Sequence, residues 1–131
     1  MTGEEYLLLH PYDAVDAFHE AFGLPRGTAP AFPDLPQRGL RVKLLREEFE
    51  EYLKAEGDND LIEVADALAD IIYIACGTAV AYGIPLDRVF AEVHRSNMAK
   101  LVDGKVIRRE DGKVLKPEGW TPPDIKGVMD L

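Results

Sequence analysis

LIEVADALADIIYIA, residues 61–75, is the stretch around which the chain is organised. Its apolar residues fall on nearly every side of a helical wheel, which is typical of a helix that is buried on most sides. Three carboxylates interrupt it at i, i+3 and i+7 and so share one stripe of that helix: Glu63, Asp66 and Asp70. A buried carboxylate without a partner is unfavourable, and the stretch contains no basic residue. The stripe therefore needs a partner from elsewhere: a basic side chain, a shared proton or a metal ion.

A second acidic stretch, REEFEEYLK at residues 46–54, offers a match. In a helix it places Glu47, Glu48 and Glu51 within one turn of each other, so that they share a face. A hard divalent cation with oxygen ligands neutralises such groups, and Mg²⁺ is typically bound by carboxylates together with substrate phosphates. We therefore predict a metal–carboxylate site between the two helices. The alternative for residues 46–54 is a solvated face, as helical charge runs usually are.

Composition excludes several classes of function. The chain has 131 residues, 47% hydrophobic and 30% charged, which predicts one soluble globular domain over residues 1–131. A net charge of −9 argues against binding to nucleic acid or to an anionic membrane. Cys76 is the only cysteine, which favours a reducing compartment. The longest uncharged stretch, 71–86, is shorter than the roughly 18 residues of a membrane span. We expect a cytoplasmic protein.

The helical spacing of apolar residues and the glycines and prolines between these stretches predict an all-α fold. Helices are expected at residues 13–22, 37–55, 61–82 and 85–100, and Gly23 and Gly83 are expected to end the first and third. The second helix should bury Val42, Leu44, Leu45, Phe49, Tyr52 and Leu53.

Short connections between these helices favour an antiparallel four-helix bundle. A small C-terminal β-hairpin, residues 105–107 with 114–115, should precede a tail that ends in a short helix at 124–129. A helix that is apolar on all sides in so small a chain predicts an oligomer, either a homodimer or a dimer of dimers.

Several blocks of the sequence together resemble a known family. The all-α nucleoside triphosphate pyrophosphatases, and their MazG-like members in particular, carry E-E-x-x-E on one helix and E-x-x-D on the next. This chain has EEFEE at residues 47–51 and EVAD at 63–66, followed by ALADIIY at 67–73. The stretch EVHRSNMAK at 92–100 is similar to the family's next helix. LKPEGW at 115–120 and FHEAFG at 18–23 are similar to the tail and first helix of a subgroup that cleaves dUTP or other dNTPs.

The chain departs from the family pattern at one point. In many relatives the metal-binding Asp directly precedes an apolar stretch. That register makes Asp70 the ligand and puts the expected Glu at Ala67. In the alternative register Glu63 and Asp66 form E-x-x-D themselves. The resemblance therefore implies Glu48, Glu51 and Asp70 as metal ligands, with Asp66 next and Glu63 after it.

The resemblance also implies an activity, the hydrolysis of a nucleoside triphosphate, dUTP among the candidates, to a monophosphate and pyrophosphate. Mg²⁺ would be the cofactor, with Mn²⁺ as a substitute, and Glu47 would be the general base. Lys100, Arg95 and Lys116 would bind phosphate oxygens, Asn97 would donate a hydrogen bond to sugar or phosphate, and Trp120 would stack on the base or plug the tail.

Three other hypotheses compete with this one. A phosphoribosyl-ATP pyrophosphohydrolase would share the acidic motif on the same fold. A non-catalytic helical module could use its acidic stripe to bind a basic partner. A di-iron carboxylate bundle would need Glu-x-x-His pairs, and neither acidic helix contains a histidine.

Overall fold

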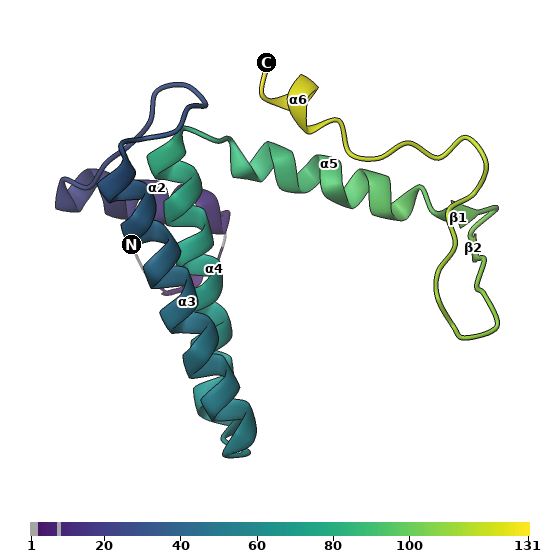
Figure 1. Cartoon of the computed structure of the whole chain (residues 1–131), viewed down its shortest axis with the longest axis horizontal. Coiled ribbons are helices and arrows are strands. Elements are labelled where there is room, and N and C mark those ends of the chain that lie inside the picture. The colour runs from purple at the N-terminus through teal and green to yellow at the C-terminus, as the bar shows by residue number, and fades with distance from the viewer. Residues whose placement is uncertain (1–2, 8) are drawn as a thin grey trace. The chain divides into compact units, whose positions relative to one another are not determined.

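The computed structural model describes residues 3–7 and 9–131, and these residues are mostly helical (Figure 1). Helices account for 61% of the described residues, and the sheet there consists of one small antiparallel hairpin, which confirms the all-α prediction. The chain divides into two compact units, Met1–Leu86 and Asp87–Leu131. The four-helix bundle and the single domain stay predictions.

The first unit is built around a pair of long helices. It contains α1 (Gly3–Tyr6), α2 (Pro11–Phe22), α3 (Leu35–Gly57) and α4 (Leu61–Tyr82). A three-residue turn joins α3 to α4, and α4 packs against both α3 and α2.

Side-chain caps and left-handed glycines set the helix ends. Asp34 caps α3 by accepting from the Gln37 amide, and Asp60 caps α4 by accepting from the Glu63 amide. Gly23 and Gly83 end α2 and α4 at φ of 66° and 68°, as expected. The helix expected from residue 37 begins two residues earlier because Asp34 caps it.

Three helices of the first unit meet at Gly77 of α4. The His19 Nδ1–H of α2 donates to the Pro25 carbonyl over 2.8 Å. The buried Arg41 guanidinium of α3 donates to the Thr78 hydroxyl and to the Ile74 carbonyl over 3.1 and 3.0 Å. A Cβ at Gly77 would lie 2.5 Å from Arg41 Nη2 and 3.0 Å from His19 Nε2, so the absence of a side chain permits this packing.

Burial in the first unit differs from the expectation in two ways. The buried residues of α4 lie mostly in its C-terminal half, whereas Leu61 and Ile62 are 81% and 80% exposed. The prediction of a helix buried on most sides is therefore wrong for the single chain. Of the expected inner face of α3, Leu44 and Tyr52 are partly buried, while four residues are exposed: Val42, Leu45, Phe49 and Leu53.

By length and composition alone, α4 could cross a membrane; it is the single such helix in residues 3–7 and 9–131. The same composition is found in core helices of soluble proteins. Asp66 and Asp70 also lie along α4, and carboxylates in the hydrocarbon region of a bilayer are unfavourable.

The second unit holds α5 (Leu86–Met98), β1 (Leu101–Val102), β2 (Lys105–Val106) and α6 (Ile125–Val128), with α5 beginning one residue before the unit boundary. Leu101 pairs with Val106 and Val102 with Lys105, so the hairpin lies earlier than predicted.

The hairpin turn explains this difference. Asp103 and Gly104 both have positive φ, 49° and 74°, as the favoured two-residue turn requires. The expected pairing of 105–107 with 114–115 is reduced to an isolated bridge between Arg108 and Val114 and neighbouring backbone hydrogen bonds. The short C-terminal helix is present as α6, capped by Asp124.

Candidate functional site

Three carboxylates of the first unit come together between α3 and α4. One oxygen each from Glu48, Glu51 and Asp70 lies within 4.8 Å of the others. We call these three residues the acidic cluster. Glu48 and Glu51 are one turn apart on α3, and Asp70 comes from the packed α4. Helical spacing predicted that Glu48 and Glu51 share a face, but it also placed Asp70 on one stripe with Glu63 and Asp66, which are not members of the cluster.

The electrostatics of the acidic cluster favour a cation. Burial, followed by the nearby Glu51 carboxylate, raises the pKa of Glu48 from 4.5 to about 7. Burial and the charge of Asp66 raise the pKa of Asp70. Glu48 Oε2 is buried without a hydrogen-bond donor, and within the described part of the chain no ion pair joins the cluster to a basic side chain. A divalent ion would satisfy that oxygen and relieve the repulsion.

The remaining predicted carboxylates lie around the acidic cluster. Asp66 is exposed but close enough for its charge to raise the pKa of both Glu48 and Asp70. Glu63 is exposed at the start of α4 and lines a small hollow with Glu51, Lys54 and Asp60, among others.

Two further positions bear on the family pattern. Ala67, where many relatives would carry the metal-binding Glu, is 4% exposed, so no acidic side chain enters the core there. Glu47, the predicted base, is exposed, with its Oε1 4.0 Å from Lys43 Nζ. It is not a member of the acidic cluster.

The second unit gathers four of the predicted substrate-binding residues. Lys100 and Lys116 place their ammonium groups 5.6 and 4.8 Å from the centre of the Trp120 ring. Lys100 also donates to Asn97 Oδ1 over 3.1 Å. We call these residues the lysine–tryptophan cluster. It combines two cations with an aromatic face, which suits a phosphate chain and a base.

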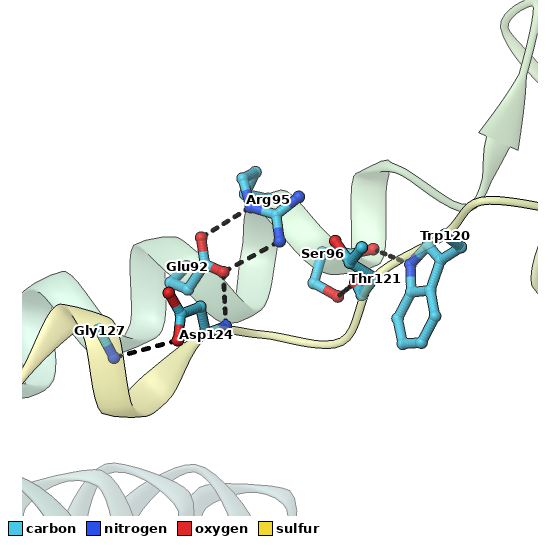
Figure 2. A network of polar contacts seen from close by, with 7 residues as sticks. All are labelled: Glu92, Arg95, Ser96, Trp120, Thr121, Asp124 and Gly127. Carbon is cyan, nitrogen blue, oxygen red and sulfur yellow. Dashed lines mark hydrogen bonds and ion pairs between the residues drawn. The ribbon is translucent and has the colours of Figure 1, made fainter.

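Hydrogen bonds to α5 hold Trp120 in place (Figure 2). Its Nε1–H donates to the Ser96 carbonyl over 2.7 Å, and the buried Ser96 hydroxyl donates to the Thr121 carbonyl over 3.0 Å. No sequence pattern points to Ser96 or Thr121, because both contacts involve backbone carbonyls.

Arg95 does not belong to the lysine–tryptophan cluster. Its guanidinium donates to both carboxylate oxygens of Glu92 over 2.6 and 2.9 Å. Glu92 also accepts from the backbone amide of Asp124, and the Arg95 contact followed by this bond lowers the pKa of Glu92 to about 2. The pair therefore anchors the tail to α5, as Figure 2 shows.

Comparison with known protein families finds a match that covers most of the first unit. Residues 15–97 match the model of a family described as phosphoribosyl-ATP pyrophosphohydrolase. The match contains the acidic cluster and Asn97 but ends before Lys100, Lys116 and Trp120.

One curated relative is an uncharacterized protein of Acanthamoeba polyphaga mimivirus, 39% identical over 80 residues. That alignment covers 58% of this chain and 32% of the viral protein, so the chain matches about a third of the relative's length.

Proposed function

Since the chain belongs to the phosphoribosyl-ATP pyrophosphohydrolase family, within the MazG-like all-α NTP pyrophosphatases, we propose that it hydrolyses a nucleoside triphosphate to a monophosphate and pyrophosphate. The family points to a pyrophosphohydrolase that acts on nucleotide phosphates. The finer assignment is to an NTP or dNTP, with dUTP among the candidates.

The observation that carries this proposal is the buried, unpartnered Glu48 oxygen inside a group of three carboxylates. Burial of such an oxygen is unfavourable on a solvated acidic face, whereas in a metal site the bound ion compensates for the lost hydration. Glu48, Glu51 and Asp70 would hold Mg²⁺ or Mn²⁺, with Asp66 as the next ligand and Glu63 after it. When bound, the ions neutralise phosphate charge and lower the pKa of a water molecule.

The chain's own residues would complete the chemistry. Glu47 is proposed to accept the proton of the attacking water as general base. Lys100 and Lys116 would donate charge-assisted hydrogen bonds to phosphate oxygens, with Asn97 as a neutral donor. Trp120 would offer its ring to the base. Of the predicted substrate-binding residues, Arg95 has the least support, because its guanidinium is already hydrogen-bonded to Glu92.

Phosphoribosyl-ATP is the second candidate substrate, because the matching family bears that name. Both candidates would be cleaved at the anhydride bond between the α- and β-phosphorus atoms, and they differ in the nucleoside, because phosphoribosyl-ATP carries a phosphoribosyl group on its adenine ring. For either substrate we propose a cytoplasmic enzyme that acts without nucleic acid or a membrane.

The test is a panel of NTPs, dNTPs and phosphoribosyl-ATP with Mg²⁺, scored for both products of each reaction. We expect pyrophosphate together with the matching monophosphate, loss of turnover in EDTA, and recovery with Mg²⁺ or Mn²⁺. Glu48→Ala and Asp70→Asn should each abolish turnover in a folded protein. Turnover in EDTA, or in both variants, would overturn the proposal, as would release of inorganic phosphate alone.

A further inference from the structure

A hollow with a basic lining opens on the first unit, where the first half of α3 passes the end of α4. Its volume is about 440 Å³. Three basic side chains of α3 line it, Arg38, Lys43 and Arg46, together with Leu35 and Val42 of the same helix and with Tyr82 of α4. None of the described residues that line it is acidic. We call this surface the basic hollow.

The basic side chains of the hollow gather in a part of the chain that is otherwise strongly acidic. Residues 1–86 contain 16 Asp and Glu residues against six Lys and Arg residues, and three of these six line the basic hollow. Lys43 lies 4.0 Å from a carboxylate oxygen of Glu47. In the described part of the chain Arg38 and Arg46 form no ion pair, and the Arg38 guanidinium lies over the Phe32 ring at 4.2 Å. Unpaired cations around a concave surface attract anions to it.

A fourth cation lies behind this surface. Arg41 is only 7% exposed, and its hydrogen bonds go to uncharged oxygens of α4, the Thr78 hydroxyl and the Ile74 carbonyl. Within the described residues no carboxylate forms an ion pair with it, and its electrostatic interaction is with Tyr82, a residue of the hollow's lining. A buried guanidinium without a counter-ion is unfavourable. An anion bound on the other side of Tyr82 would offset part of that charge.

The rest of the lining is apolar and aromatic. Leu35 and Val42 are exposed at 74% and 54%, and the Tyr82 ring packs edge to face against Phe32 with ring centres 5.7 Å apart. A hollow of this volume suits a small organic molecule and is larger than a simple phosphate ion requires. A nucleoside phosphate has a polyanionic chain for the basic side chains and a flat ring for the apolar and aromatic ones.

The basic hollow is separate from the acidic cluster. Arg46 and Glu48 are two residues apart on α3, so their side chains leave the helix about 200° apart around its axis. The two surfaces also treat an anion differently. The carboxylates of the acidic cluster repel a phosphate group unless a metal ion lies between them, whereas the basic hollow attracts it directly. Binding that does not depend on a metal ion therefore distinguishes the basic hollow from the acidic cluster.

We propose that the basic hollow is a second nucleotide site, which binds a nucleoside di- or triphosphate without a metal ion. The phosphate chain lies on Arg38, Lys43 and Arg46, and the ring lies against Tyr82 and its apolar neighbours. The two guanidinium groups donate paired, charge-assisted hydrogen bonds to phosphate oxygens, and the lysine adds a third positive charge. This site goes beyond the proposed hydrolysis, because no bond breaks there and the acidic cluster takes no part.

The first experiment is isothermal titration calorimetry of the full chain with ADP in EDTA, which keeps the acidic cluster free of metal. We expect the wild type to bind ADP and Arg46→Gln to raise the Kd about tenfold. Lys54→Gln is the matched control, because Lys54 is an exposed residue of the same helix outside the hollow and its replacement changes the net charge equally; its Kd should equal that of the wild type. Absence of binding up to about 1 mM ADP, or an equal loss in both variants, would overturn the proposal.

The second experiment tests where ADP binds and what its ring contributes. In EDTA, Lys116→Met should keep most of the ADP affinity; loss of binding in Lys116→Met but not in Arg46→Gln would place ADP in the lysine–tryptophan cluster and contradict the proposal. Pyrophosphate should bind the wild type about tenfold more weakly than ADP, because it has no ring to contact Tyr82. Equal affinities would reject a nucleotide as the ligand. These titrations measure no turnover, so their outcome is independent of the proposed activity.

Discussion

Replacing Glu48 by glutamine should change how the stability of the metal-free protein depends on pH. In the folded chain, burial and neighbouring carboxylates raise the pKa of Glu48 from 4.5 to about 7. The folded state therefore binds more protons than the unfolded state between these values, and the free energy of unfolding falls as the pH rises through them. A rise of this size corresponds to a loss of up to about 3 kcal/mol between about pH 5 and pH 8.

The assay is urea unfolding in EDTA at fixed protein concentration, followed by circular dichroism at several pH values. The wild type should lose stability on going from about pH 5 to about pH 8. Glu48→Gln should lose much less and be the more stable protein at the higher pH, with a residual slope from Asp70, whose pKa is also raised. Glu50→Gln, an exposed neighbour on the same helix, should keep the wild-type slope.

Mg²⁺ provides the second half of this test. At about 100 times its dissociation constant an ion bound only to the folded state adds about 2.7 kcal/mol. The wild type and Glu50→Gln should gain this stability near pH 8, while Glu48→Gln should lose most of the gain. An equal pH dependence of stability for wild type and Glu48→Gln in EDTA, or equal stabilisation of both by Mg²⁺, would refute the assignment of Glu48 as a buried metal ligand.

Four further predictions address other parts of the chain. Gly77→Ala should lower the free energy of unfolding, measured in thermal melts, by about 1–3 kcal/mol, because the new Cβ meets Arg41 Nη2 at 2.5 Å. The control is Gly57→Ala, whose Cβ meets nothing within 4 Å, and its stability should stay within about 0.5 kcal/mol of the wild type. Glu47→Gln should reduce kcat about 100-fold or more but keep the rise in Tm that Mg²⁺ causes, as expected for a general base. Loss of both kcat and the rise in Tm would identify Glu47 as a metal ligand. Lys116→Met should raise KM severalfold with little change in kcat, and an unchanged KM in steady-state kinetics would remove it from the substrate site. Trp120→Phe removes the donor to the Ser96 carbonyl and should cost about 1 kcal/mol, seen as faster hydrogen exchange in the tail; unchanged exchange would contradict the anchoring role.

Local rules in the sequence determined the helices and most of the acidic cluster. Caps such as Asp34 and Asp60, and glycines such as Gly23 and Gly83, act on neighbouring backbone groups, so helix bounds are readable without the rest of the fold. Helical spacing likewise fixes that Glu48 and Glu51 share a face of α3. The Asp103–Gly104 turn also follows a local rule, whereas the predicted hairpin of 105–107 with 114–115 is centred on the later turn at Gly112.

Tertiary structure alone decided which side of each helix is buried and which partners the charges find. Arg41 lies on the side of α3 that faces α4, because two oxygen acceptors on α4 and the absence of a side chain at Gly77 accommodate its guanidinium. The apolar Phe49 of the same helix is exposed. The Glu92–Arg95 pair is local, at i, i+3 on α5, but only the tertiary structure brings the Asp124 amide to the same carboxylate. Such choices depend on contacts between residues far apart in the chain, where hydrophobicity and spacing carry no information.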